Sequence, residues 1–341
     1  MPRKVQLSRI GLIFVILVCV VVLIVPNTAG SQEPAPSPHE QLLEPVASSS
    51  YPDAFVAYQL VPRWNGGYLV RWTRENSPSD TAENVFVYDR NGKLVGKTRI
   101  WLPDASLIYL DNVVVGPHAE IAAVGRAVDR SGIFADFLAR LTLATHQLQV
   151  VQTSPFHGRD VAFGPDGTLW VVGYEVGPEN RVSDSDYSIV RHFDASNRLE
   201  GSYVPHSSLQ CTKVEAGSFT VAEPAILTSS DRVGILLAGC NTWLELSTAG
   251  EVLGKWTWQK STSVSSIHTV AFTLSNEVYG SVTSSANWLG HLDKKTGTWQ
   301  PVNTDLPLSR GARYVSLMGS DGDKLVYRSG DAELRWSKPS R

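Results

Sequence analysis

The chain has 341 residues with a formal net charge of −3, and 18% of its residues are charged. This balance excludes a strong basic field of the kind that holds nucleic acid or an anionic membrane surface. With 43% hydrophobic residues, 27 Gly, 19 Pro and no sustained helical periodicity in its body, the chain is typical of a globular, turn-rich, all-β protein.

The chain begins with a targeting segment, residues 1–30. Arg3 and Arg9 precede an uncharged apolar run from Ile10 to Val25, and the small residues Thr28–Gly30 follow it. This pattern is typical of an export signal or of an uncleaved membrane anchor, and the sequence leaves both open. In either case we expect the rest of the chain outside the cytoplasm, periplasmic or secreted, with membrane contact only through residues 10–25.

Residues 31–50 are rich in Pro and Ser and predict an extended tether between the leader and the body. The body, residues 51–341, is long enough for one large all-β domain. We expect this domain to be a monomer.

The body repeats one sequence pattern, which consists of an apolar strand, a tight polar turn and a second apolar strand. The pattern is clearest over Asp160–Gly173, where a Pro-Asp-Gly turn separates two apolar runs. The turns fall at residues 65–67, 116–118, 165–167, 230–231, 274–276 and 320–322. Their spacing of about 45 to 65 residues is close to the length of a four-stranded blade, so the repeat predicts a six-bladed β-propeller.

Each unit except the last continues with a second hairpin. Its copies cover residues 85–95, 137–148, 189–199, 243–253 and 289–299. Most contain a Gly, Asn or Asp that tolerates the positive φ of a short turn. The last unit ends before a fourth strand is complete. Because a propeller must close its ring to hide strand edges, residues just before Phe55 are predicted to supply that strand as a clasp.

Two cysteines are available for a disulfide in an oxidising compartment, because Cys19 lies inside the apolar leader run. Cys211 falls in the longest connection between units, and Cys240 ends a strand of the fourth inner hairpin. The sequence predicts a Cys211–Cys240 disulfide that holds this connection, with two buried thiols as the alternative.

Candidate site residues are sought just before each inner strand, because propeller ligands usually meet the channel mouth where those strands begin. The positions are Asp111, Asn112, His157, Arg159, Asp160, Glu223, His268 and Arg313. The arginines favour a small polar ligand with a carboxylate. The alternative is that the acidic and basic groups neutralise one another in a water-filled channel.

The carboxylates in this set raise the possibility of a metal site. Asp111, Asp160 and Glu223 would bring oxygen ligands from separate strands, which suits Ca²⁺ or Mg²⁺. His157 and His268 lie nearest to the mouth and would act as a general base, as ligands or as hydrogen-bonding loop residues. The sequence has neither a Gly-x-Ser-x-Gly elbow nor a phosphate-binding loop, which disfavours nucleophilic and nucleotide chemistry.

The unit Arg159–Gly173, continued by Tyr187–Asp194, resembles the NHL-repeat and gluconolactonase-like six-bladed propellers. Their repeats read as an apolar strand, Pro-Asp-Gly, an apolar strand and a hairpin with Phe-Asp. In gluconolactonase-like enzymes Glu, Asn and Asp from separate inner strands hold a divalent metal at the channel. The resemblance therefore implies Glu223, Asn112, Asp111 and Asp160 as metal candidates.

Two functions follow from this sequence, since the fold serves enzymes and binding modules alike. The first is a non-enzymatic exported propeller that binds a small polar ligand or a protein partner. The second is a metal-dependent hydrolase or lactonase that acts at the channel mouth.

Overall fold

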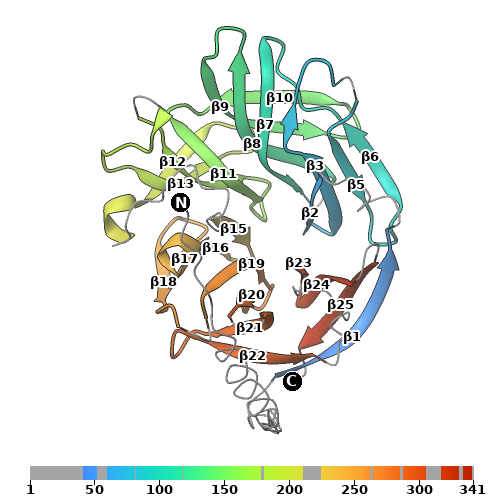
Figure 1. The fold of residues 1–341 in the computed structure, drawn as a ribbon, viewed down its shortest axis with the longest axis vertical. Helices are drawn as coiled ribbons and strands as arrows, with labels where there is room; N and C mark the ends of the chain where they lie inside the picture. The colour runs from blue at the N-terminus through green and yellow to red at the C-terminus, as the bar shows by residue number, and fades with distance from the viewer. Residues whose placement is uncertain are drawn as a thin grey trace, which may run out of the picture. The chain divides into compact units, whose positions relative to one another are not determined.

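Blades, each built on four antiparallel strands, are arranged around a common axis (Figure 1). The computed structural model describes residues 41–51, 60–80, 82–116, 118–177, 180–209, 224–261, 264–284, 287–304, 316–329 and 333–339. These residues belong to one compact unit, Glu40–Arg341, whereas the predicted leader lies outside the described residues. Within the described ranges no helix is long and apolar enough to cross a membrane.

Within each of the first three blades, the main strands follow chain order from the innermost strand at the axis to the outermost strand. Blade 1 consists of β2 (Leu60–Asn65), β3 (Tyr68–Thr73), β5 (Val85–Tyr88) and β6 (Leu94–Thr98). Blade 2 consists of β7 (Ala105–Val115), β8 (Glu120–Asp129), β9 (Phe134–Thr142) and β10 (Gln147–Gln152), with β4 (Glu75–Asn76) added beside β7. Blade 3 consists of β11 (Phe156–Phe163), β12 (Leu169–Glu175), β13 (Ser188–Phe193) and β14 (Leu199–Pro205).

The remaining three blades complete the predicted six. Blade 4 consists of β15 (Ala225–Thr228), β16 (Arg232–Leu237), β17 (Thr242–Ser247) and β18 (Val252–Thr257). Blade 5 consists of β19 (Ser266–Phe272), β20 (Val278–Thr283), β21 (Asn287–Asp293) and β22 (Thr298–Thr304). Blade 6 consists of β23 (Ser316–Asp321), β24 (Lys324–Ser329), β25 (Glu333–Pro339) and β1 (Gln41–Ser50). Short 3₁₀ helices, η2 (His206–Leu209) and η3 (Ala238–Cys240), lie at the end of blade 3 and inside blade 4.

The predicted turns join the first and second strands of all six blades, and the predicted second hairpins form the third and fourth strands of blades 1 to 5. Gly66 shows why the turn positions could be predicted from residue type. Its backbone has a φ of +57°, and a Cβ there would lie 2.2 Å from the carbonyl oxygen of Val115 in the next blade. Only glycine fits a turn that combines a left-handed backbone with this close approach.

The predicted clasp is confirmed, because β1 pairs antiparallel with β25 as the outermost strand of blade 6. It also pairs in parallel with β22 of blade 5, so the N-terminal strand joins two blades. The strand takes in residues 41–50, which the sequence analysis assigned to the tether. That assignment overlooked Leu43, which is buried between blades 5 and 6.

Each pair of neighbouring blades shares a buried apolar cluster. The cluster between blades 3 and 4, for example, packs Trp170 and Ile189 against Ile235 and Leu244. A blade is therefore covered on both faces by its neighbours. This explains why β12 is a continuous apolar run rather than an alternating strand, with burial from Leu169 to Tyr174.

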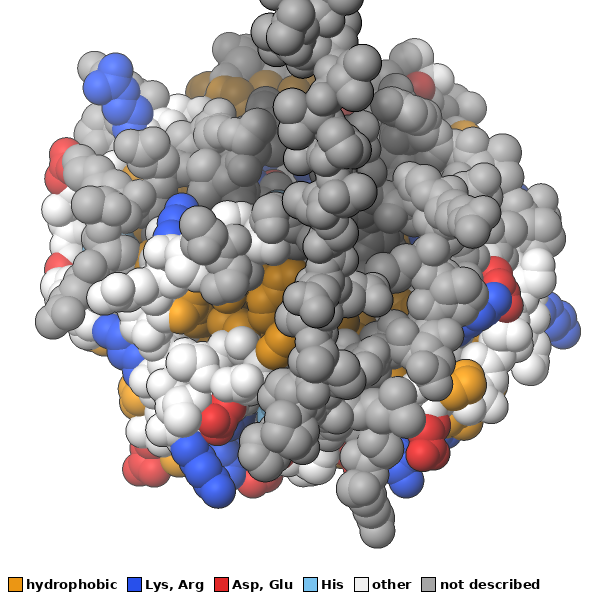
Figure 2. Space-filling model, turned by 60° about the horizontal axis from the view of Figure 1, so that its bottom comes forward, with side chains coloured by type: hydrophobic (Ala, Val, Ile, Leu, Met, Phe, Trp, Pro, Cys, Tyr) orange, Lys and Arg blue, Asp and Glu red, His pale blue; other side chains and the backbone are white. Residues whose placement is uncertain are grey.

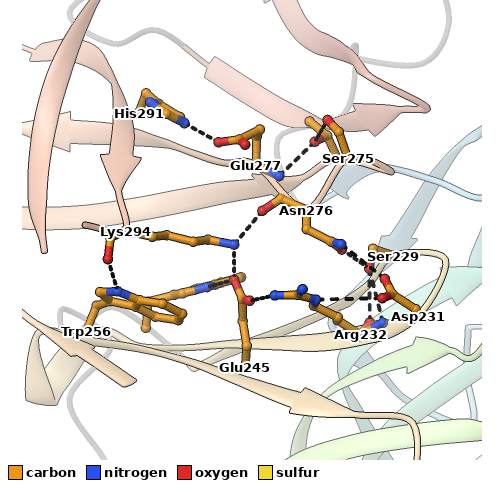
Figure 3. A network of polar contacts seen from close by, with 12 residues as sticks. Ser229, Asp231, Arg232, Glu245, Trp256, Ser275, Asn276, Glu277, His291 and Lys294 are labelled. Atoms are coloured by element: carbon orange, nitrogen blue, oxygen red, sulfur yellow. Dashed lines mark hydrogen bonds and ion pairs between the residues drawn. The ribbon is translucent and has the colours of Figure 1, made fainter. Parts of the chain in front are cut away.

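A buried polar network joins blades 4 and 5 (Figure 3). The Glu245 carboxylate is fully buried and accepts hydrogen bonds from Arg232 Nη1 at 2.9 Å and from Trp243 Nε1 at 2.8 Å. Lys294, which follows β21 of blade 5, pairs with the same carboxylate and donates to the carbonyl oxygen of Asn276. The two cations and the indole N–H satisfy the buried carboxylate, so this network holds two blades together.

Candidate functional site

Arg63 of β2 reaches across the propeller axis to three other blades. Its Nη1 donates to Asn112 Oδ1 of β7 at 3.0 Å and to Asp160 Oδ1 of β11 at 2.6 Å. Its Nη2 donates to the carbonyl oxygen of Ile226 in β15 at 3.3 Å. One guanidinium therefore connects the innermost strands of blades 1 to 4.

The Asp160 carboxylate is 1% exposed and is held by further backbone donors. Oδ1 also accepts from the N–H of Val161 at 2.7 Å, and Oδ2 accepts from the N–H of Ile226 at 2.9 Å. Burial raises the pKa of Asp160, whereas Arg63 and the two backbone N–H groups act in the opposite direction. The donors around it fit the ionised form, because the carboxylate accepts three N–H hydrogen bonds and Arg63 balances its charge.

The paired polar residues found in the sequence lie at β-bulges inside the inner strands. Register shifts occur at Asp111 in β7, at Arg159 in β11 and beside His268 in β19. A bulge inserts an extra residue and re-aims side chains. It explains how Asp111 and Asn112, or Arg159 and Asp160, both contribute to channel networks although they are adjacent in the chain. The expectation that these residues precede the inner strands was wrong, because the strands begin earlier than the turn spacing indicated.

A cavity of about 270 Å³ lies at the turn end of the six innermost strands. Each of these strands contributes an apolar side chain to it, namely Trp64, Val115, Phe163, Leu227, Val270 and Met318. Arg63 is the only charged residue among the described residues that line it. The cavity thus combines apolar side chains from all six blades with neutral polar groups and one guanidinium.

Three of the four hydroxyl groups in the described wall are already bonded to neighbouring blades, and the fourth, that of Ser230, donates to Asp231 in the same turn. Thr228 Oγ1 donates to the carbonyl oxygen of Phe163 at 2.6 Å, and Ser320 Oγ donates to the carbonyl oxygen of Phe272 at 2.7 Å. Ser229 Oγ lies 2.5 Å from Asn276 Oδ1. These bonds join adjacent blades, so Arg63 is the strongest donor group left to the cavity.

A second polar cluster is centred on His157 of β11, which is 4% exposed. Its Nδ1 lies 2.6 Å from Asp136 Oδ1 of β9, and Arg126 Nε donates to the same oxygen at 2.9 Å. Its Nε2 lies 3.5 Å from Asp111 Oδ2 and 3.4 Å from Arg159 Nη1. Arg159 Nη1 also donates to Asp111 Oδ1 at 2.6 Å. Acidic and basic groups therefore pair with one another here, and His157 is a buried strand residue rather than a loop residue.

Asp136 is the ionised centre of this cluster. Burial opposes ionisation of its carboxyl, but the hydrogen bond from His157 and the adjacent Arg126 outweigh burial and hold its pKa below the ordinary value. An ionised carboxylate can only accept, so Nδ1 of His157 carries the hydrogen in this contact.

Replacing Asp136 with Asn is expected to lower the free energy of unfolding by about 3 kcal/mol at neutral pH, because Arg126 and His157 lose their buried carboxylate. The pKa of Asp136 is lower in the folded state, so its contribution is complete above about pH 4 and is lost as pH falls through the folded-state pKa. Urea denaturation of both proteins should give stabilities that converge as the pH falls through the lowered folded-state pKa of Asp136. A difference that stays constant across this range would contradict the assignment.

The other predicted site residues do not join these clusters within the described residues. His268 is exposed in β19, and its Nε2 lies 3.0 Å from Ser266 Oγ. Glu223, Arg313 and Cys211 lie outside the described residues. Cys240 is disulfide-bonded, and its pairing with Cys211 stays a prediction.

The metal hypothesis stays a prediction. The described residues contain no group of three or more His, Cys, Asp or Glu that could hold a metal ion. Asp111 and Asp160 each pair with a different arginine, and Glu223, the third proposed ligand, is not among the described residues.

Sequence reasoning missed Arg63 and Asp136. Arg63 precedes Asn112 by 49 positions, about one repeat, so the period itself would have indicated it. Asp136 lies in the third strand of its blade, away from the innermost-strand positions at which the repeat indicates channel residues. Its contact with His157 depends on how blades 2 and 3 pack, which no local pattern reveals.

Charged side chains of both signs lie on the face of the molecule that Figure 2 shows. In the coloured parts of Figure 2, Lys and Arg side chains lie in small groups interspersed with Asp and Glu. This agrees with the net charge of −3, and the absence of a nucleic-acid partner stays a prediction.

The six blades and the N-terminal clasp define the chain as a six-bladed β-propeller. No protein-family model and no curated protein matches the sequence.

Solved structures do match it. A protein of Bacteroides fragilis NCTC 9343 that is provisionally described as exported has a TM-score of 0.55 and 13% identity, over 88% of this chain and 96% of that one. A protein of unknown function from Bacteroides thetaiotaomicron VPI-5482 has a TM-score of 0.52 and 11% identity, over 88% and 76%. A streptogramin B lyase has a TM-score of 0.47 and 11% identity, over 86% and 88%. Such distant likeness shows the fold alone.

Proposed function

We propose that this protein is an extracytoplasmic binding module that holds a small ligand in the cavity at the turn end of its propeller. The observation that carries the proposal is the convergence of all six innermost strands on one cavity, to which each contributes an apolar side chain and which a single guanidinium lines within the described residues. Ligand sites are typically concave, mostly apolar and fitted with a few polar groups.

The dimensions of the cavity favour a small ligand. Its volume of about 270 Å³ lies near the lower end of the usual range for small-molecule sites. The wall comes from strands that are buried against neighbouring blades, and the ring is closed by β1. A site built on such elements is formed before the ligand arrives, so little ordering entropy is lost on binding.

The proposed compartment rests on the leader. Arg3 and Arg9 followed by the apolar run Ile10–Val25 are typical of export, and an oxidising compartment suits a disulfide at Cys240. We propose that Cys211 is its partner and that the protein acts as a monomer.

We do not extend the proposal to metal-dependent hydrolysis. The resemblance to gluconolactonase-like propellers implies Glu223, Asn112, Asp111 and Asp160 as metal candidates. In the described residues Asp111 pairs with Arg159, and Asp160 pairs with Arg63.

Filling the cavity is expected to abolish ligand uptake. Leu227 is 9% exposed and lines the cavity, so Leu227→Trp places a large ring in the space. We expect the variant to bind N-phenylnaphthylamine, a neutral dye that fluoresces in apolar surroundings, at least about tenfold more weakly than the wild type. Fluorescence titration measures this difference.

The matched control is Leu199→Trp, because Leu199 is 51% exposed on the outer strand β14 and does not line the cavity. Overpacking at Leu227 is expected to destabilise the fold by about 1 to 3 kcal/mol, so thermal melts must show that both variants are folded. Equal dye binding by folded Leu227→Trp and by the wild type would refute the cavity as the binding site.

A further inference from the structure

We infer that the ligand of the cavity is a neutral molecule, apolar over most of its length, with a carbonyl or amide oxygen that accepts a hydrogen bond from Arg63. This inference rests on the proposed function and names its ligand class. It differs from the sequence-based expectation, in which an arginine at the channel favours a carboxylate.

Charge balance at Arg63 is the first step. Arg63 Nη1 lies 2.6 Å from Asp160 Oδ1, and both oxygens of that carboxylate accept N–H groups. The pair is neutral as a whole. Since no other charged side chain among the described residues lines the cavity, an entering carboxylate would lose its hydration without gaining a counter-charge.

Hydrogen-bonding capacity is the second step. A guanidinium has five N–H groups. Within the described residues those of Arg63 bond to Asn112, Asp160 and the carbonyl oxygen of Ile226, and this leaves its Nε–H and one Nη2–H without a bond. The Arg63 side chain is 14% exposed and lines the cavity. It can therefore donate to a neutral acceptor while it keeps its salt bridge.

The rest of the wall supports the same conclusion. The hydroxyls of Thr228 and Ser320 are bonded to backbone carbonyl oxygens of the neighbouring blades. They offer no ready replacement for the water shell of an anion. Apolar side chains from every innermost strand would instead cover an alkyl or aryl body.

Octanamide and octanoate test this inference, because they share one alkyl tail and differ in charge. Displacement of N-phenylnaphthylamine should be measured at about pH 8, where octanoate is fully ionised. We expect wild-type protein to bind octanamide at least about tenfold more tightly than octanoate. Asp160→Asn leaves the charge of Arg63 unbalanced, so octanoate should gain at least about tenfold in affinity while octanamide changes little.

Asn112→Asp gives the opposite charge change and covers the case in which Asp160→Asn does not fold. A second carboxylate beside Arg63 should weaken octanoate further and leave octanamide nearly unchanged. Arg198→Ala, which removes an exposed charge on blade 3, serves as the control and should leave both affinities unaltered.

The outcomes separate the two proposals. Octanoate binding as tightly as octanamide to the wild type would overturn the neutral ligand class and leave the cavity as a binding site. The same holds if the dye binds in the cavity and neither compound displaces it. Absence of dye binding to the wild type, or dye binding that Leu227→Trp does not affect, would overturn the proposed function together with this inference.

Discussion

A chain that lacks residues 41–51 is expected to lose at least about 5 kcal/mol of unfolding free energy and to leave little folded protein at room temperature. The deletion removes β1, the outer strand of blade 6, and with it the pairing to β25 and β22. It also removes Leu43 from the cluster between blades 5 and 6, and Tyr51 from the cluster between blades 6 and 1. Circular dichroism with urea denaturation measures the loss.

The size of this effect follows from ring closure. Tyr51 is fully buried, and its hydroxyl donates to the carbonyl oxygens of Asp89 at 3.0 Å and Arg90 at 3.1 Å in blade 1. One short segment therefore binds blades 5, 6 and 1. Without it β25 becomes an exposed edge, and aggregation is expected to accompany unfolding.

Val46→Ser is the matched control within the same strand. Val46 is 49% exposed, so this change should alter stability by no more than about 0.5 kcal/mol. If the deleted chain unfolds cooperatively within about 1 kcal/mol of the wild type, β1 is not the element that closes the ring.

The fold could be predicted from the sequence because its repeat is expressed in local chemistry. The turn at Pro165–Gly167 and its counterparts need residues that adopt turn geometry, and the buried strands between them need apolar side chains on both faces. The clasp could be predicted because the last unit is one strand short. The turns and strands depend on residues that are close in the chain, and the clasp follows from the number of strands in the last unit.

The geometry of the site depends on contacts between blades, which explains why prediction was incomplete there. Asp160 was identified from its place in the repeat, but its partner Arg63 lies 97 positions earlier in the chain. The bulges that allow Asp111 and Asn112 to act together leave no mark in the pattern of apolar residues. The cavity itself lies at the turn end of the strands, where its lining consists of strand-end apolar residues and turn residues that the repeat explains as structural.

Asp160→Ala is expected to destabilise the propeller by about 3 to 5 kcal/mol. The Arg63 guanidinium, only 14% exposed, would lose its counter-charge at the axis. The N–H groups of Val161 and Ile226 would also lose their acceptor, and each unsatisfied buried donor carries its own penalty. Urea denaturation at neutral pH measures the change.

Removing Arg63 as well shows whether Asp160→Ala destabilises the protein mainly by losing the Arg63–Asp160 attraction or mainly by leaving the buried guanidinium of Arg63 unpaired. The double variant Arg63→Met with Asp160→Ala should be more stable than Asp160→Ala alone by at least about 1 kcal/mol, because no unpaired guanidinium then remains at the axis. Arg198→Ala breaks an ion pair with Asp194 whose arginine is 83% exposed, and it should change stability by less than about 0.5 kcal/mol. A double variant less stable than Asp160→Ala would mean that Arg63 stabilises the ring by itself. Its contacts with Asn112 and Ile226, rather than its charge balance with Asp160, would then be what joins the blades at the axis.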